Sequence, residues 1–197
     1  MHAERIGDFM EFVSSTGLTA ETELVESADL AVSYDSSYTT DGTTVYLYGN
    51  DAATVDLSSG LYGAAVNIDA TNSTGANYLF GNWTSNIIIS GPGPSHLWGG
   101  DDYSNDFLIG GWSYDTFYYG MYEGNDAILN GSSMDIVNLH DAYVSDIVST
   151  AYDGTNLALL FGTGNALVVA CTDMLSPIFT TADGGTYTFN RTTYSWQ

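Results

Sequence analysis

The sequence predicts an all-β fold, a parallel β-roll or β-helix solenoid with a small C-terminal β cap. Short apolar segments recur along the chain at a nearly constant spacing, and clusters of Gly, Asn, Asp and Ser separate them. The composition agrees, with 22 Gly and only 3 Pro among 197 residues. Regular spacing of this kind is typical of stacked repeats, in which each unit buries its apolar side against its neighbours.

The first part of the chain is predicted to contain an N-terminal segment and the first strands of this solenoid. Residues 1–29 form an acidic N-terminal segment with a possible short helix, whose apolar face would hold Ile6, Phe9, Met10 and Val13. Strand-like pieces follow between turn clusters, at Leu30–Tyr34, Thr44–Tyr48, Thr54–Leu57 and Ala64–Ile68. Because these pieces are spaced like the later units, we expect a solenoid over residues 30–140 whose repeats are clearest over 77–139.

An acidic repeat defines the middle of the chain. Each of four aspartates comes two residues before a large apolar residue, at intervals of 9, 11 and 9 residues, and a glycine precedes each one: Asp106, Asp115, Asp126 and Asp135. Three polar residues continue the same register upstream: Asn77, Asn86 and Ser95. One strand and one turn per unit, with two units per coil, would place alternate units on the same edge.

Two columns of polar residues follow from this geometry. One edge would carry Asn86, Asp106 and Asp126, and the other would carry Asn77, Ser95, Asp115 and Asp135. Coils stack about 4.8 Å apart, so two unpaired carboxylates would repel by roughly 3.5 kcal/mol at an effective dielectric constant near 20. A divalent cation between coils would remove this repulsion. The alternative interpretation is that these aspartates are solvated turn residues.

Calcium is the cation that suits such columns best. It takes six to eight oxygen ligands in flexible loops, whereas magnesium requires stricter octahedral geometry and zinc prefers His and Cys. The predicted calcium-site residues are the four aspartates and the glycines of their turns: Asp106, Asp115, Asp126, Asp135, Gly99, Gly100, Gly110, Gly111 and Gly124.

The repeat resembles the RTX, or hemolysin-type, calcium-binding family. Asn105-Asp-Phe-Leu-Ile-Gly-Gly111, Asp115-Thr-Phe-Tyr-Tyr-Gly120 and Glu123-Gly-Asn-Asp-Ala-Ile128 are similar to its nonapeptide Gly-Gly-x-Gly-x-Asp-x-apolar-x. The resemblance covers about residues 77–197 and is most specific over 97–139. It implies Ca²⁺ binding and a secreted, bacterial cell-surface location. No unit keeps every glycine, so the resemblance implies the fold more firmly than a full row of ions.

The charge of the chain limits its partners. It carries 24 acidic residues against Arg5 and Arg191, a formal net charge of −22. Nucleic acid is excluded as a partner because phosphate contacts depend on Lys and Arg. We also expect no membrane insertion, since no apolar stretch reaches the length of a membrane-spanning helix. No signal peptide is recognisable, and we expect the chain to be a piece of a longer protein.

Residues 141–197 are expected to form the C-terminal capping region. Residues 142–148 indicate a short helix or turn. Two strand pairs follow, Leu157–Phe161 with Ala166–Ala170, and Thr186–Phe189 with Thr193–Trp196. Such a cap would cover the strand edges and core that an open coil stack exposes.

The function that these features predict is non-enzymatic. We expect a calcium-stabilised, extracellular structural or adhesive module of a bacterial surface protein. One alternative is a self-assembling subunit of an extracellular filament or surface layer, and a third is a polysaccharide-binding or polysaccharide-degrading β-helix. Half of a central aromatic cluster should lie in the core and half outside, where it would contact a cell-surface glycan or another copy: Trp98, Trp112, Tyr114, Phe117, Tyr118, Tyr119 and Tyr122.

Overall fold

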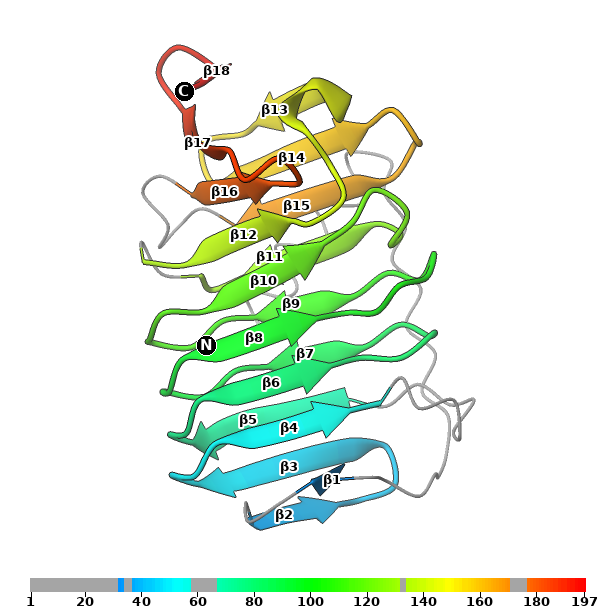
Figure 1. Ribbon diagram of the computed structural model, residues 1–197, viewed down its shortest axis with the longest axis vertical. Coiled ribbons are helices and arrows are strands. Elements are labelled where there is room, and N and C mark those ends of the chain that lie inside the picture. Colours follow the sequence, from blue (N-terminus) through cyan, green and yellow to red (C-terminus); the bar gives the residue numbers. More distant parts are fainter. Residues whose placement is uncertain (1–31, 34–36, 58–66, 132–133, 171–176) are drawn as a thin grey trace.

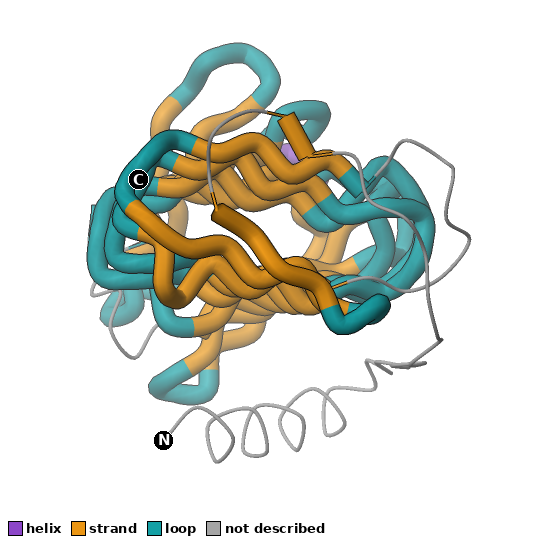
Figure 2. Tube along the Cα trace, turned by 90° about the horizontal axis from the view of Figure 1, so that it is seen from below, coloured by secondary structure: helices purple, strands orange, loops and turns teal. Residues whose placement is uncertain are grey.

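The chain winds into a β-solenoid in which two nine-stranded sheets face each other, as Figure 1 and Figure 2 show. The structure is a computed structural model that describes residues 32–33, 37–57, 67–131, 134–170 and 177–197. The helix predicted within residues 1–29 lies outside these ranges. Within them, the all-β parallel solenoid predicted from the sequence is confirmed.

Successive strands of the central region alternate between the two sheets. The first sheet contains, in spatial order, β1 (Val32–Ser33), β4 (Ala53–Asp56), β6 (Asn77–Phe80), β8 (Ser95–Trp98), β10 (Thr116–Tyr119), β12 (Ile136–Leu139), β16 (Ile178–Thr181), β17 (Thr186–Asn190) and β18 (Ser195–Trp196). The second contains β13 (Ile147–Tyr152), β14 (Asn156–Phe161), β15 (Ala166–Ala170), β11 (Asp126–Leu129), β9 (Phe107–Ile109), β7 (Ile87–Ile89), β5 (Asn67–Ser73), β3 (Thr44–Gly49) and β2 (Ser37–Thr40).

Apolar ladders fill the space between the sheets. In the first sheet the parallel register aligns Val55, Leu79, Leu97, Phe117, Val137 and Phe179, all fully buried. In the second sheet it aligns Val45, Ile68, Ile88, Leu108, Ile128 and Val169. Each such side chain stabilises the fold by about 1.5–3 kcal/mol relative to an exposed one. The repeat therefore specifies the fold by placing one apolar residue per strand at the same depth.

The aromatic cluster divides between core and surface: burial alternates along β10, and the exposed rings lie in turns outside the strands. Phe117 and Tyr119 are fully buried, whereas Trp112, Tyr114 and Tyr122 are exposed. Three strands of the second sheet depart from alternation, since β9, β11 and β15 are buried along their whole length.

Antiparallel strands terminate both ends of the stack. At one end β2 pairs with β3 and β1 pairs with β4, both antiparallel. At the other end β13, β14 and β15 form an antiparallel meander, and β16, β17 and β18 form another (Figure 1). Both meanders are continuous with the solenoid, because β15 pairs in parallel with β11 and β16 with β12. The region predicted as a cap thus adds a further strand to each parallel sheet before it turns antiparallel.

Candidate functional site

The polar columns lie at the two turn edges of the solenoid. Asp106 ends one turn from the first sheet to the second and Asp126 begins the strand after the next such turn, and the pairing of Phe107 with Ala127 aligns them. Asp115 and Asp135 end turns in the other direction, aligned by the pairing of Thr116 with Ile136. All four aspartates are at most 2% exposed. The interpretation of these residues as solvated turn residues is therefore wrong.

Backbone amides of the preceding coil bind these carboxylates. The Asn86 N–H donates to Asp106 Oδ1 at 2.7 Å, and the Asp106 N–H donates to Asp126 Oδ1 at 2.9 Å. On the other edge the Asp115 N–H donates to Asp135 Oδ1 at 2.8 Å. Hydrogen bonds to a charged acceptor are stronger than those between neutral groups, so each aspartate links its own coil to the one before it. Sequence reasoning missed this role, because the same spacing also predicts a column of cation ligands.

Both carboxylate oxygens of Asp115 accept hydrogen bonds. Its Oδ1 accepts hydrogen bonds from the Ser95 N–H at 2.8 Å and the Ser90 hydroxyl at 3.1 Å, and its Oδ2 accepts one from the Gly111 N–H at 2.8 Å. Burial nevertheless raises the pKa of Asp115 to about 6, and the charge of Asp135 adds to this effect. The donors that surround it fix the position of this carboxylate.

Asp106 and Asp126 lie in a more strongly acidic environment. Burial raises the pKa of both carboxyl groups well above the usual range. The charges of Asp102 and Glu123 raise both pKa values further, and the charge of Asp106 raises that of Asp126. This edge therefore concentrates negative charge with fewer hydrogen-bond donors than Asp115 receives, which favours the uptake of a cation or a proton.

Three buried oxygens near this edge have no hydrogen-bond partner. They are Asp102 Oδ2, Ser104 Oγ and Asp106 Oδ2, and all belong to the turn between β8 and β9. A buried polar atom without a partner costs about 1–3 kcal/mol. Oxygen ligands of this kind fit calcium, so the Asp106 edge passes a chemical test for the predicted ion.

The predicted calcium-site glycines allow neighbouring coils to approach closely. A Cβ on Gly111 would lie 1.8 Å from the carbonyl oxygen of Gly91 in the preceding coil, and one on Gly99 would lie 2.1 Å from Asp106 Oδ2 within its own turn. Gly100 and Gly124 also contact the preceding coil, at Asn82 and Ser104, while Gly110 packs against the Phe117 ring. Packing alone therefore explains why these positions exclude larger residues.

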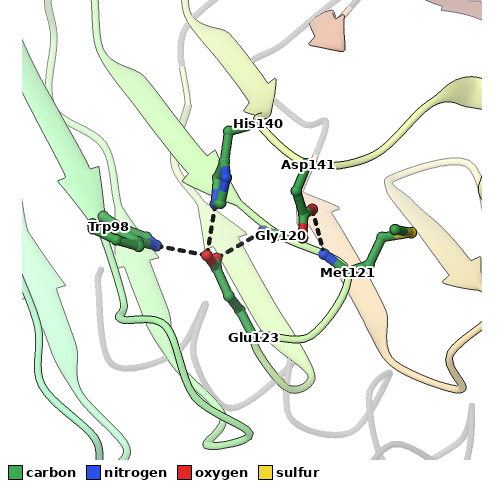
Figure 3. A network of polar contacts seen from close by, with 6 residues as sticks. All are labelled: Trp98, Gly120, Met121, Glu123, His140 and Asp141. Atoms are coloured by element: carbon green, nitrogen blue, oxygen red, sulfur yellow. Dashed lines mark hydrogen bonds and ion pairs between the residues drawn. The ribbon is translucent and has the colours of Figure 1, made fainter. Parts of the chain in front are cut away.

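A network around Glu123 was not predicted from the sequence (Figure 3). Glu123 is 1% exposed, and its Oε1 accepts hydrogen bonds from Trp98 Nε1 at 2.9 Å and His140 Nε2 at 2.6 Å. Its Oε2 accepts one from the Gly120 N–H at 2.7 Å. The hydrogen bond to Glu123 raises the pKa of His140. These residues belong to three successive coils, so the network connects the turns at this edge.

The described part of the chain contains no cluster of three or more His, Cys, Asp or Glu side chains arranged to hold a metal ion. No helix in the same ranges combines the length and the apolar character of a membrane-spanning segment.

Comparison with protein-family models found no matching family, and comparison with curated proteins found no match. The resemblance to RTX repeats therefore rests on the repeat residues themselves.

Proposed function

We propose that this chain is a calcium-stabilised, extracellular structural or adhesive module of a bacterial surface protein, without enzymatic activity. The observation that carries the proposal is the burial of Asp106 and Asp126 on one edge, where Asp102 and Glu123 add to the negative charge. A buried carboxylate is costly unless it is paired, and calcium is a suitable counterion outside the cell.

The two acidic edges fit calcium unequally. Asp106 keeps one carboxylate oxygen without a hydrogen-bond partner, whereas both oxygens of Asp115 accept hydrogen bonds. Binding at the Asp106 edge therefore displaces fewer existing interactions. An ion at the Asp115 and Asp135 edge remains a prediction that rests on the repeat.

The net charge gives calcium a second effect. At −22 the folded chain repels itself, and any bound divalent cation lowers this repulsion. Monovalent salt screens the same charges but occupies no specific site. A specific calcium site is thus distinguished from screening by its selectivity.

Thermal melts test the proposal directly. Unfolding would be followed by far-UV circular dichroism in EDTA, in calcium and in an equal concentration of magnesium, at constant ionic strength. We expect calcium to raise Tm by several degrees and magnesium to raise it less, because a ligand that binds the folded state stabilises it. Identical Tm values in all three buffers would show that the solenoid folds without calcium.

The adhesive role has a candidate surface beside the acidic edge. A hollow of about 610 Å³ is lined by Tyr103, Met121, Tyr122, Asp146, Val148 and Thr163. Tyr103 is 74% exposed and Tyr122 is 51% exposed. Exposed aromatic rings beside hydroxyl and carboxylate groups suit a sugar, and the charge of the chain favours a neutral one.

Substitution of the two tyrosines tests this surface. The variant Tyr103→Ala with Tyr122→Ala should bind a panel of neutral polysaccharides at least about tenfold more weakly than the wild type, because ring contacts each contribute about 1 kcal/mol. The matched control is Trp112→Ala with Tyr114→Ala, which removes two exposed rings from the opposite edge. Equal binding by both variants would contradict a glycan site in the hollow.

The alternative function, a self-assembling filament, is tested by sedimentation in calcium, which distinguishes a polymer from a single chain.

A further inference from the structure

The turn between β8 and β9 is longer than its counterpart in the preceding coil. It contains eight residues, 99–106, whereas six residues, 81–86, connect β6 to β7. The additional length contains Asp101 and Asp102. Because the flanking strands remain in parallel register, this turn accommodates its additional residues without disturbing the sheets.

Alternate side chains of this turn are directed differently. Asp102, Ser104 and Asp106 each place one oxygen in the interior, where it is shielded from solvent. Between them, Tyr103 is 74% exposed. Asn105 instead accepts a hydrogen bond at its Oδ1 from the Asn125 N–H of the next coil, at 3.0 Å. The segment 102–106 therefore separates three solvent-shielded oxygens from the side chains that contact solvent or the next coil.

Each aspartate uses one oxygen for the fold and leaves the other without a partner. Asp102 Oδ1 accepts a hydrogen bond from the Ser104 N–H, and Asp106 Oδ1 accepts one from the Asn86 N–H. The remaining oxygens, both Oδ2, have no hydrogen-bond partner, and neither does Ser104 Oγ. Asp106 itself is 1% exposed. Backbone amides thus hold the two carboxylates, while the three remaining oxygens have unused capacity as acceptors.

We propose that this turn binds one calcium ion through the side-chain oxygens of Asp102, Ser104 and Asp106. The site deepens the function proposed above, since it names ligands for calcium at the Asp106 edge. It differs from the predicted columns because its ligands come from a single turn, and Asp102 and Ser104 are outside the repeat pattern. Oxygens at positions i, i+2 and i+4 of one loop are a known way to bind calcium.

The chemistry of the turn favours calcium over other divalent cations. Two carboxylates and a hydroxyl are hard oxygen ligands, and no His or Cys lies in residues 99–106 to favour zinc. Calcium accepts variable coordination, so water and backbone carbonyl groups complete its shell. Gly99 leaves room beside this oxygen, because a Cβ there would lie 2.1 Å from Asp106 Oδ2.

Calorimetric titration of the full chain with calcium chloride tests the site. The test variant is Asp102→Asn with Ser104→Ala, and the matched control is Asp101→Asn, which removes the same charge from an exposed residue of the same turn. We expect the test variant to bind one calcium ion fewer than the wild type, and the control to keep the wild-type stoichiometry. The test substitutions remove no hydrogen bond of the fold, since an asparagine at 102 can still accept from the Ser104 N–H.

The outcomes separate this site from the broader function. Calcium stabilisation of the wild type with unchanged stoichiometry in the test variant would overturn the turn site and leave the proposed function standing. Absence of calcium binding by the wild type would overturn both. Matching far-UV spectra of wild type and test variant in EDTA would establish that a lost ion reflects lost ligands; loss of the ion together with the β spectrum would overturn the assignment.

Discussion

Glu123 connects residues that are far apart in the sequence. Its carboxylate accepts hydrogen bonds from Gly120, His140 and Trp98, which are 3, 17 and 25 residues away. The His140 ring also packs edge-on against the Trp98 ring, with 5.8 Å between centroids. A buried carboxylate with three such hydrogen bonds fixes the path of its turn, and it keeps one histidine close to a negative charge.

Titration of the histidines by NMR tests this arrangement at the residue scale. The hydrogen bond to Glu123 raises the pKa of His140, whereas burial lowers the pKa of His96. The His140–Glu123 ion pair should therefore stabilise the fold below the ordinary histidine pKa of about 6.5, and this contribution should be lost as the pH rises through the higher folded-state value.

In the variant Glu123→Gln, the pKa of His140 should fall while that of His96 stays unchanged, which makes His96 the internal control. Unchanged titration of both rings would show that Glu123 does not set the charge state of His140. His96 lies in β8 and His140 directly follows β12 of the same sheet, so a general loss of structure would move both titrations.

At the scale of elements, the turns determine how closely coils stack. Gly124 has φ +91°, and a Cβ there would lie 1.6 Å from the Ser104 carbonyl oxygen of the preceding coil. Gly164 has a similar φ of +94°, but a Cβ there would meet open space. A comparison of Gly124 with Gly164 therefore distinguishes two requirements for glycine: a left-handed backbone conformation, which both positions have, and close contact between coils, which only Gly124 has.

Gly124→Ala should therefore destabilise the protein more than Gly164→Ala. The control should cost about 1–2 kcal/mol, the usual penalty of a left-handed conformation for a residue with a Cβ. Gly124→Ala should cost at least about 2 kcal/mol more, because the Ser104 turn must move. Urea unfolding in EDTA measures both values, and an equal loss in the two variants would show that the coils tolerate separation at this turn.

Much of this fold follows from the sequence, because the apolar repeat and its turns specify each coil. The two strand pairs expected after residue 156 form, as β14 with β15 and β17 with β18, although β18 covers only Ser195–Trp196 of the expected Thr193–Trp196. The strand β2 was missed, since Ser37-Tyr-Thr-Thr40 has no apolar alternation and is held by its pairing with β3. Likewise β5 extends to Ser73, five residues beyond the expected 64–68, because it follows its neighbours β3 and β7; residues 64–66 of that prediction lie outside the described ranges.

The candidate site was predicted less completely. The repeat predicts which aspartates share an edge, because this depends only on the coil period. It does not predict that backbone amides bind them, nor that Glu123 meets His140, since these contacts depend on the path of individual turns. The signal for the turn site was present in the additional residues Asp101 and Asp102, but the sequence alone does not show that oxygens of Asp102 and Ser104 are buried.

For the whole molecule, repulsion between acidic residues opposes the stacking of coils that buries the apolar core. The described core is apolar throughout, with a leucine, isoleucine, valine or phenylalanine at each level of both sheets. Nearly all the net charge of −22 therefore lies on the edges, the surface and the regions that the structure does not describe. The same stacking that buries the core also aligns the carboxylates, so counterions at the edges should affect the stability of every coil.

The interval of the aspartate hydrogen bonds has a consequence for how such a molecule can change in length. On both edges the donor and the acceptor are 20 residues apart, from Asn86 to Asp106 to Asp126 and from Ser95 to Asp115 to Asp135. Suppose that one 20-residue block is duplicated or deleted between equivalent points of two coils. Each of these backbone amides then again meets a side-chain carboxylate or amide oxygen in the neighbouring coil. The gene can therefore lengthen or shorten this protein by whole coils, while insertions of other sizes must be confined to the turns.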